Sequence, residues 1–256
     1  MIETLALGSA VIVAGHRGYK SEYPENTILA FEKALELGVD MIEFDLRLSK
    51  DGFVVIIHDE TVNRTTNGTG EVSSFSLAEL KQLDAGGWFN ERFAGLPIPT
   101  LEELCELLER YPHVLLNVEI KPSIHSEEVA DKAVALLETK ELLDRCVFTS
   151  FDANLTAYLH RTYGVRMQGF PEQEMHNFKQ GPEGTYSQMW AIGIHMPLLT
   201  PEAVERYKTM GLLPWCYCPD NAEQVEYALG CGVTLMTCND PVPAMQAVKP
   251  LNESLA

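Results

Sequence analysis

Short apolar runs alternate with helical stretches along most of this chain. The apolar runs have the length of buried strands, and the stretches between them carry apolar residues at helical spacing. The predicted strands span residues 11–14, 41–46, 54–57, 114–120, 146–150, 165–170, 190–194, 212–217 and 233–237. The predicted helices span residues 26–37, 100–110, 127–138, 153–163, 201–210 and 221–229. Because strands and helices alternate, the pattern predicts a parallel sheet covered by helices.

The number of predicted strands favours a closed barrel over an open sheet. A chain of 256 residues has the usual size of one (β/α)8 barrel. A doubly wound sheet that binds a dinucleotide would carry a GxGxxG motif after its first strand, and no such motif follows residues 11–14. We therefore predict an α/β fold, a (β/α)8 TIM barrel, in which residues 1–256 form a single domain.

Residues 61–100 interrupt this alternation. They are rich in turn signals such as Asn67-Gly68 and Gly86-Gly87, and they contain one short helical candidate at residues 77–83. A loop of this length in a compact domain is usually functional. We expect an inserted subdomain on the barrel rim, after the second strand region.

The composition is that of a folded domain in water. Hydrophobic residues make up 46% of the chain and charged residues 22%. No apolar run approaches the roughly 20 residues that span a bilayer. Glu3 stands where a secretory signal would carry a positive charge, so we expect a cytoplasmic protein without stable membrane insertion. The six cysteines form no CxxC pair and are expected to be reduced.

The formal net charge is −18, which disfavours non-specific binding to nucleic acid or to an anionic membrane. An anionic substrate would need local positive charge from a metal or from a placed Arg or Lys. A homodimer remains compatible with the sequence, because exposed apolar helix faces could pair.

Polar residues at the carboxyl ends of the predicted strands are the candidates for chemistry, because those ends carry the active site in a parallel barrel. His16 and Arg17 follow the first strand and are flanked by Gly15 and Gly18. A histidine can move a proton near neutral pH, and the arginine fork suits phosphate oxygens. His58 follows the apolar run 54–57, so it can serve as acid or base in partnership with His16.

Carboxylates end two further strands. Glu43 and Asp45 lie two residues apart and therefore share one face of their strand. Two buried like charges need a cation, either an Arg or Lys across the barrel or a hard divalent metal ion. Glu119 could complete a three-carboxylate metal site. Lys121 could then lie against a phosphate, or it could simply neutralise Glu119.

Two aromatic or imidazole side chains are weaker candidates. His195 follows a predicted strand and could belong to a site. Trp215 could form a wall of the pocket, or it could belong to the aromatic core.

Several short motifs, in this order, resemble the glycerophosphodiester phosphodiesterase family, in particular its bacterial cytosolic type. The resemblance extends from about residue 11 to residue 245. Each motif is weak alone, but the ordered set is highly specific. The motifs are Gly15-His16-Arg17-Gly18, Pro24-Glu25-Asn26-Thr27, Glu43-Phe44-Asp45, His58-Asp59, Asn63-Arg64-Thr65-Thr66-Asn67-Gly68-Thr69-Gly70, Pro99-Thr100-Leu101-Glu102-Glu103 and Glu119-Ile120-Lys121-Pro122.

The resemblance implies a barrel with an inserted segment and one divalent cation, Mg²⁺ or Ca²⁺. The metal ligands it implies are Glu43, Asp45 and Glu119. The implied reaction is hydrolysis of a small glycerophosphodiester to sn-glycerol 3-phosphate and an alcohol such as choline or ethanolamine.

The resemblance also assigns the catalytic roles. It implies that His16 and His58 are the general acid and base, and that Arg17 and Lys121 bind near the phosphate. The sequence leaves open which histidine acts first, and whether water or the glycerol hydroxyl is the nucleophile. The family often has an Asn where this chain has Cys218, in Trp215-Cys216-Tyr217-Cys218, and this departure bears on the leaving group rather than on the reaction.

Two other functions compete with this interpretation. A lysophospholipase D or a phosphoinositide-type phosphodiesterase would need a hydrophobic ramp or a basic membrane-facing patch, and the net charge of −18 argues against the patch. A non-catalytic phosphodiester-binding protein is less favoured, because all the candidate catalytic residues are present.

Overall fold

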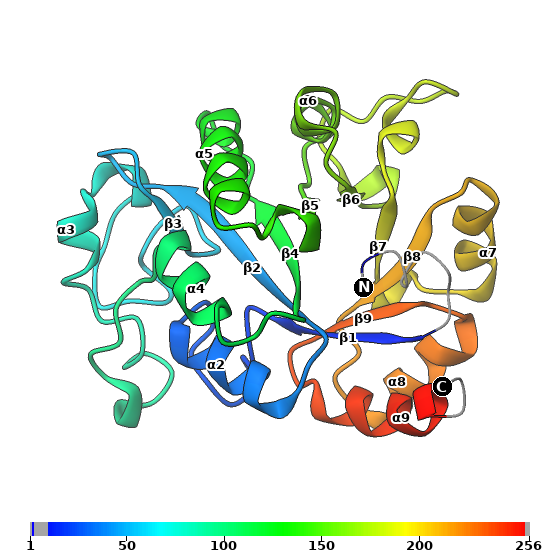
Figure 1. The fold of residues 1–256 in the computed structure, drawn as a ribbon, viewed down its shortest axis with the longest axis horizontal. Coiled ribbons are helices and arrows are strands. Elements are labelled where there is room, and N and C mark those ends of the chain that lie inside the picture. Colours follow the sequence, from blue (N-terminus) through cyan, green and yellow to red (C-terminus); the bar gives the residue numbers. More distant parts are fainter. Residues whose placement is uncertain (1, 3–9, 254–256) are drawn as a thin grey trace.

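The computed structural model describes residues 2 and 10–253, and within them the strands close into a barrel (Figure 1). One sheet contains nine strands in the order β1-β9-β8-β7-β6-β5-β4-β2-β3, and an additional β1–β2 pairing closes it. All pairs are parallel except β2 with β3. The predicted (β/α)8 barrel is confirmed. The strands are β1 (Ile12–His16), β2 (Met41–Leu48), β3 (Val54–Ile56), β4 (Leu115–Ile120), β5 (Cys146–Thr149), β6 (Met167–Gly169), β7 (Ala191–His195), β8 (Leu213–Tyr217) and β9 (Leu235–Cys238).

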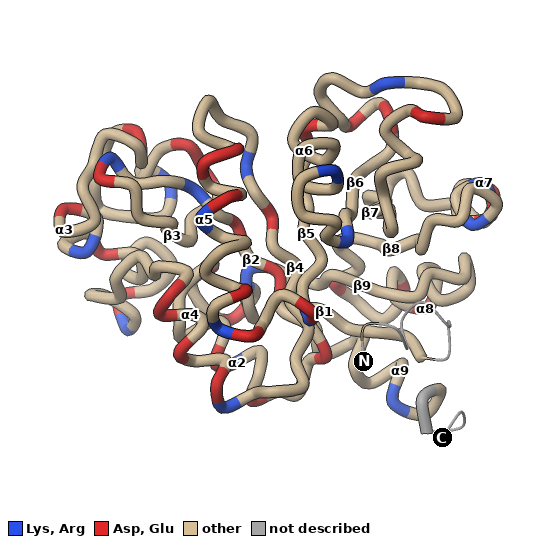
Figure 2. Tube along the Cα trace, turned by 45° about the horizontal axis from the view of Figure 1, so that its top comes forward, with Lys and Arg blue, Asp and Glu red and all other residues tan. Residues whose placement is uncertain are grey.

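Helices cover the outside of the barrel. The ends of α2 (Ile28–Leu37) are set by its capping residues. At its start the hydroxyl of Thr27 accepts a hydrogen bond from the N–H of Ala30, and at its end Gly38 has φ of 92°. The helices are α2 (Ile28–Leu37), α3 (Leu77–Leu80), α4 (Leu101–Leu108), α5 (Ser126–Thr139), α6 (Ala153–Tyr163), α7 (Pro201–Thr209), α8 (Ala222–Cys231) and α9 (Val242–Glu253). Acidic residues recur along α2, α4 and α5 (Figure 2), so part of the negative charge lies on this outer layer.

The inward-facing positions of the strands change from apolar to polar along the barrel axis. In β2 the inward positions are Met41, Glu43 and Asp45, in that order along the strand. In β4, Leu115 lies opposite Met41 and Glu119 lies opposite Asp45. The apolar members close the bottom of the barrel together with Trp215 and other small or aliphatic residues. The carboxyl ends of the strands are therefore the polar end, as the barrel architecture requires of an active site.

The long segment between β3 and α4 lies outside the barrel, at the left of Figure 1. β3 pairs antiparallel with β2, with Leu46 opposite Ile56. The segment has a hydrophobic cluster of its own, and a capping box of Thr100 and Glu103 starts α4 where it ends. This arrangement fits the expected rim subdomain, whose independence stays a prediction. The cluster consists of Val55, Ile57, Val62, Val72, Leu80, Ala85 and Ile98.

Most element bounds agree with the sequence pattern to within two residues, and three elements deserve comment. The predicted helix at residues 77–83 ends at Leu80, and the predicted strand at residues 165–170 forms ladder bonds only over Met167–Gly169. The helix α9 was not predicted, because Pro243 and Pro250 obscure its pattern. A proline in the first turn is tolerated, since that N–H has no partner within the helix.

Two expectations concern membranes and targeting. No helix in the described part of the chain has both the length and the apolar character needed to cross a bilayer. The expectation that residues 1–5 form no secretory signal rests on residues 1 and 3–5, which lie outside the described part of the chain.

Phe44 provides a test of the packing between barrel and helices. Its side chain is fully buried and meets the ring of Phe31 edge to face at 6.1 Å. Phe44→Ala should lower the free energy of unfolding by about 3–5 kcal/mol, since it leaves a cavity that the rigid barrel cannot fill. Urea denaturation at neutral pH measures the change. Phe53→Ala is the matched control, because Phe53 is 50% exposed, and equal losses in the two variants would contradict the packing described.

Candidate active site

A cavity of about 130 Å³ opens at the carboxyl ends of the strands. Both predicted catalytic histidines line it, as do Arg17, Glu119 and Lys121. The side chains proposed from separate strand ends therefore lie around one space.

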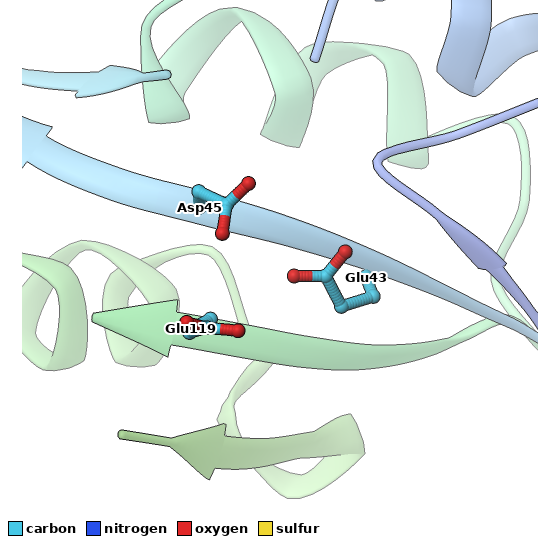
Figure 3. A group of neighbouring side chains, drawn as sticks. All are labelled: Glu43, Asp45 and Glu119. Carbon is cyan, nitrogen blue, oxygen red and sulfur yellow. The ribbon is translucent and has the colours of Figure 1, made fainter. Parts of the chain in front are cut away.

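Three carboxylates lie close together (Figure 3), and two of them, Glu43 and Glu119, line the cavity. Glu43 and Asp45 come from β2 and Glu119 comes from β4, where the register places Asp45 opposite Glu119. One oxygen from each lies within 4.8 Å of the others, and the residues are 3%, 0% and 7% exposed. Burial raises the pKa of Glu43 well above its ordinary value, and the charges of Asp45 and Glu119 add to the rise. Burial likewise raises the pKa of Glu119.

Two cations share the cluster. Lys121 Nζ lies 3.0 Å from Asp45 Oδ1 and is hydrogen-bonded to Glu119, while Arg17 Nε lies 3.3 Å from Asp45 Oδ2. Burial alone would raise the pKa of Asp45, but Lys121 and Arg17 outweigh it and hold that pKa below its ordinary value. The Arg or Lys bridge considered from the sequence is therefore present.

Arg17 and Lys121 do not neutralise the carboxylate cluster completely, so a further cation could bind. Three carboxylates face two positive side chains, and the buried Oε1 of Glu43 accepts no hydrogen bond from the described residues. Convergent, buried carboxylate oxygens are the donors that hard divalent cations take. The cluster thus fits a divalent cation as well as the two side-chain cations.

His16 ends β1 and is held by Asn239, which directly follows the neighbouring strand β9. Its Nδ1 donates to Asn239 Oδ1 at 2.6 Å, and its Nε2 lies 3.8 Å from Glu43 Oε2. Asp220 fixes the Asn239 amide, since Asn239 Nδ2 donates to Asp220 Oδ2 at 2.5 Å. The amide oxygen must then face the imidazole, so Nδ1 carries the hydrogen and Nε2 is free to accept.

The surroundings of His16 oppose its protonation. Burial lowers its pKa well below the ordinary value, and the charges of Arg17 and Lys20 lower it further. Cys218 also touches this ring, with Sγ 3.4 Å from Nδ1. The residue at which this chain departs from the family pattern therefore contacts the histidine itself.

His58 has an anionic partner. Its Nδ1 donates to Asp59 Oδ1 at 2.7 Å, and Arg64 holds that carboxylate through Nε at 2.7 Å and Nη2 at 3.0 Å. Burial lowers the pKa of His58, but Asp45 and the hydrogen bond to Asp59 oppose the shift. The two histidines thus differ in their supports, a neutral amide for His16 and a carboxylate for His58.

Glu25 joins the two halves of the site. It accepts from Arg17 Nη1 at 2.8 Å and from both terminal nitrogens of Arg64 at 2.8 and 2.9 Å. Burial opposes its ionisation, but the hydrogen bonds from Arg64 and Arg17 lower its pKa to about 2. Arg64 comes from the segment between β3 and α4, so this segment is tied directly to the site.

A tight turn after β1 aims Arg17. Its backbone has φ of 55°, and its N–H donates to Glu43 Oε2 at 2.9 Å. Gly18 follows with φ of 83°, and a Cβ there would lie 2.5 Å from the carbonyl carbon of Ala30. Only glycine fits this position.

Comparisons with known proteins identify the family of this chain. Residues 16–242 match the model of the glycerophosphoryl diester phosphodiesterase family. This chain belongs to that family. A glycerophosphodiester phosphodiesterase of Caldanaerobacter subterraneus subsp. tengcongensis is 38% identical over 93% of this chain and 98% of its own length. One of Bacillus subtilis is 31% identical over 90% of this chain and 84% of its own.

Solved structures of the family have the same fold. A phosphodiesterase of Oleispira antarctica, in complex with the product sn-glycerol-3-phosphate, superposes with a TM-score of 0.84 at 26% identity, over 95% of this chain and 98% of the other. A glycerophosphodiester phosphodiesterase of Agrobacterium tumefaciens gives 0.79 at 28% identity, over 92% and 99%.

The two remaining candidates differ in their settings: Trp215 lines the cavity, whereas His195 contacts it through Tyr217. Trp215 is 1% exposed and forms part of the cavity floor, edge to face with Trp190 at 5.9 Å. Trp215 thus lines the pocket and also belongs to the aromatic core, so both positions considered from the sequence apply. Its contact with substrate stays a prediction. His195 is exposed and stacks on Tyr217 at 5.1 Å.

Of the residues that support the two histidines, the sequence suggested only Asp59, which follows His58 directly and could either orient it or form a turn. Glu25 and Arg64 stood in motifs that contributed to the family resemblance but had no role assigned. Asp220 carried no signal of its own, and Asn239 stood in the turn Thr237-Cys238-Asn239-Asp240-Pro241, which fits the family pattern but had no role assigned. The signal that could have found Asp220 and Asn239 is their position shortly after β8 and β9, because the carboxyl ends of all the barrel strands face one site.

Glu25→Gln tests the ionic chain between Arg17 and Arg64. A depressed pKa stabilises the folded state above the unfolded pKa, and this contribution is lost as the pH falls toward the folded value. The variant should be less stable than wild type by on the order of 3 kcal/mol at pH 7, and the gap should narrow as the pH falls from about 4.5 toward 2. Urea denaturation at a series of pH values measures it.

Glu32→Gln is the control for this test. Glu32 also pairs with an arginine, Arg110, but the pair is partly exposed, so its loss should cost no more than about 1 kcal/mol. A gap for Glu25→Gln that stays constant with pH would contradict the ionic support described.

Proposed function

We propose that this chain hydrolyses small glycerophosphodiesters, such as glycerophosphocholine and glycerophosphoethanolamine, to sn-glycerol 3-phosphate and an alcohol. The observation that carries the proposal is the meeting of two histidines and three buried carboxylates around one cavity. The chain is an enzyme of the phosphodiesterase family, and its relatives carry this activity in their names. A cytoplasmic location and a homodimer stay predictions.

One divalent cation, Mg²⁺ or Ca²⁺, is proposed to bind Glu43, Asp45 and Glu119. When bound, it would polarise a phosphate oxygen and offset the repulsion among the carboxylates. The unpartnered Oε1 of Glu43 supports this position.

Arg17 and Lys121 are proposed to stabilise the charge that develops on the phosphate. Both are held by carboxylates in the folded chain, so they are oriented before the substrate binds. Preorganised donors of this kind lose little free energy to reorganisation during the reaction.

The different supports of the histidines suggest a division of labour. His16, with Nδ1 bound to the neutral amide of Asn239, has an unprotonated Nε2 facing the carboxylates and is proposed as the general base for the attacking hydroxyl, of water or of the glycerol group. His58, whose Nδ1 is bound to Asp59, is proposed as the general acid, because a carboxylate stabilises the protonated ring. His58 would give its proton to the departing alkoxide.

Replacing each histidine tests both the site and the roles. His16→Ala and His58→Ala should each lower kcat for glycerophosphocholine by about 100-fold or more, as for lost general acid–base catalysis. With the p-nitrophenyl ester of glycerol phosphate, His58→Ala should recover most of its activity, because nitrophenolate departs without protonation. His16→Ala should remain impaired. A coupled assay for glycerol 3-phosphate measures both substrates.

His160→Ala is the control, since His160 lies exposed on α6, and it should keep the wild-type rate. Near-wild-type turnover of either active-site variant would overturn the assignment of the site. Recovery of His16→Ala instead of His58→Ala would reverse the two roles.

Metal removal provides a separate test. Exhaustive chelation should abolish turnover, and added Mg²⁺ or Ca²⁺ should restore it, because the carboxylate cluster then regains its cation. Glu43→Gln should need more metal for half-maximal activity than wild type. Turnover that survives chelation would remove the metal role of Glu43, Asp45 and Glu119.

A further inference from the structure

The side of the cavity formed by β5, β6 and β8 differs from the carboxylate side. Phe151 follows β5, Phe170 follows β6 and Tyr217 ends β8, and all three line the cavity. The Phe151 and Phe170 rings stack with centroids 3.6 Å apart, and the Tyr217 ring meets Phe170 edge to face at 5.6 Å. We call these three residues the aromatic wall.

A carboxylate stands behind this wall. Tyr217 Oη donates to Glu174 Oε1 at 3.1 Å. The other oxygen, Oε2, is buried and accepts no hydrogen bond from the described residues. Glu174 therefore differs from Asp45 and Glu119, whose charges are shared with Lys121 and Arg17.

The aromatic wall begins beside the place expected for the phosphate. Lys121 Nζ lies 5.8 Å from the centroid of the Phe151 ring. A group esterified to a phosphate at Lys121 would therefore extend along the wall toward Tyr217 and Glu174. Aromatic faces backed by a carboxylate attract an organic cation, which gains from the ring quadrupoles and from the anionic charge.

The two halves of a glycerophosphodiester are not equally suited to this surface. The glycerol half is a neutral polyol and needs hydrogen-bond partners, which aromatic faces do not supply. The alcohol half of glycerophosphocholine or glycerophosphoethanolamine carries a positive charge a short distance from the phosphate. The wall therefore matches the leaving group rather than the glycerol.

We propose that Phe151, Phe170, Tyr217 and Glu174 form the leaving-group subsite, and that it selects cationic alcohols over neutral ones. This inference rests on the proposed function, because it names the half of the substrate that the same cavity recognises. Tyr217 positions the Glu174 carboxylate through its hydroxyl, and the half-buried Phe151 ring, supported from behind by the buried Phe170, provides the face that the cation covers.

The experiment compares three substrates that differ only in the leaving group. Wild type should hydrolyse glycerophosphocholine and glycerophosphoethanolamine with a higher kcat/KM than the neutral-headed glycerophosphoglycerol. Glu174→Gln should lower kcat/KM for the two cationic substrates by about 10-fold, as for loss of one partly desolvated charge interaction. It should leave the value for glycerophosphoglycerol nearly unchanged. Phe151→Leu, which keeps an apolar side chain, should reduce the same preference.

Glu172→Gln is the matched control. Glu172 belongs to the same short helical turn and has the same charge, but its carboxylate binds Gln180 and does not contact the wall. It should keep the wild-type preference. An equal loss for all three substrates in Glu174→Gln, or an unchanged preference, would overturn the proposed selectivity.

A binding measurement separates this inference from the proposed reaction. Ligand-observed NMR should detect tighter binding of choline than of its neutral isostere 3,3-dimethylbutan-1-ol, and Glu174→Gln should remove the difference. If the chain turned over no glycerophosphodiester but bound choline in this way, the proposed function would fail and the subsite would stand. Equal binding of the two probes to wild type would refute the subsite whatever the activity.

Discussion

The repulsion among three buried carboxylates is the constraint around which this site is built. The pleat of β2 turns Glu43 and Asp45 to the same side, and the parallel register with β4 brings Glu119 level with Asp45. Buried carboxylates this close cannot all be charged without cations. Arg17 and Lys121 supply part of the positive charge that the cluster requires.

The demand for compensation explains an otherwise odd feature of the fold, the long segment between β3 and α4. Arg64 in this segment binds Glu25 and Asp59, and these two residues hold Arg17 and His58. The segment also supplies His58 and Asp59 themselves, and without its Arg64 the Glu25 carboxylate would keep Arg17 as its remaining ion-pair partner among the described residues. The insertion therefore orders the rim of the site, and its small hydrophobic cluster gives it the rigidity to do so.

The cavity is divided by charge. On one side, carboxylates and cations nearly balance and suit a metal-bound phosphate. On the other, stacked aromatic rings and Glu174 suit an organic cation. Since both sides lie on strand ends of the same rigid barrel, a substrate that satisfies both is held across its scissile bond, which is how binding away from the reacting atoms can position it.

The sequence alone determined the barrel and the positions of the chemistry. Strand and helix periodicities are local, and polar residues that end buried strands in a parallel barrel must face one end, so His16, Glu43, Asp45 and Glu119 could be placed at that end before any coordinates. His58 follows the antiparallel strand β3, so the family resemblance, and not the strand pattern, indicated its place in the site. The unpredicted helix α9 shows the limit of this approach, because its prolines conceal a pattern that packing against α8 sustains.

Only the tertiary structure decided how these side chains are supported. Asn239 lies 223 residues from His16 in the chain, and Arg64 lies 39 residues from Glu25. No periodicity encodes such pairs, since they depend on loop paths and rotamers that form only when the barrel closes. The difference between the two histidines is partly of this kind: the carboxylate partner of His58 is the adjacent Asp59, whereas folding alone brings the neutral amide of Asn239 to Nδ1 of His16.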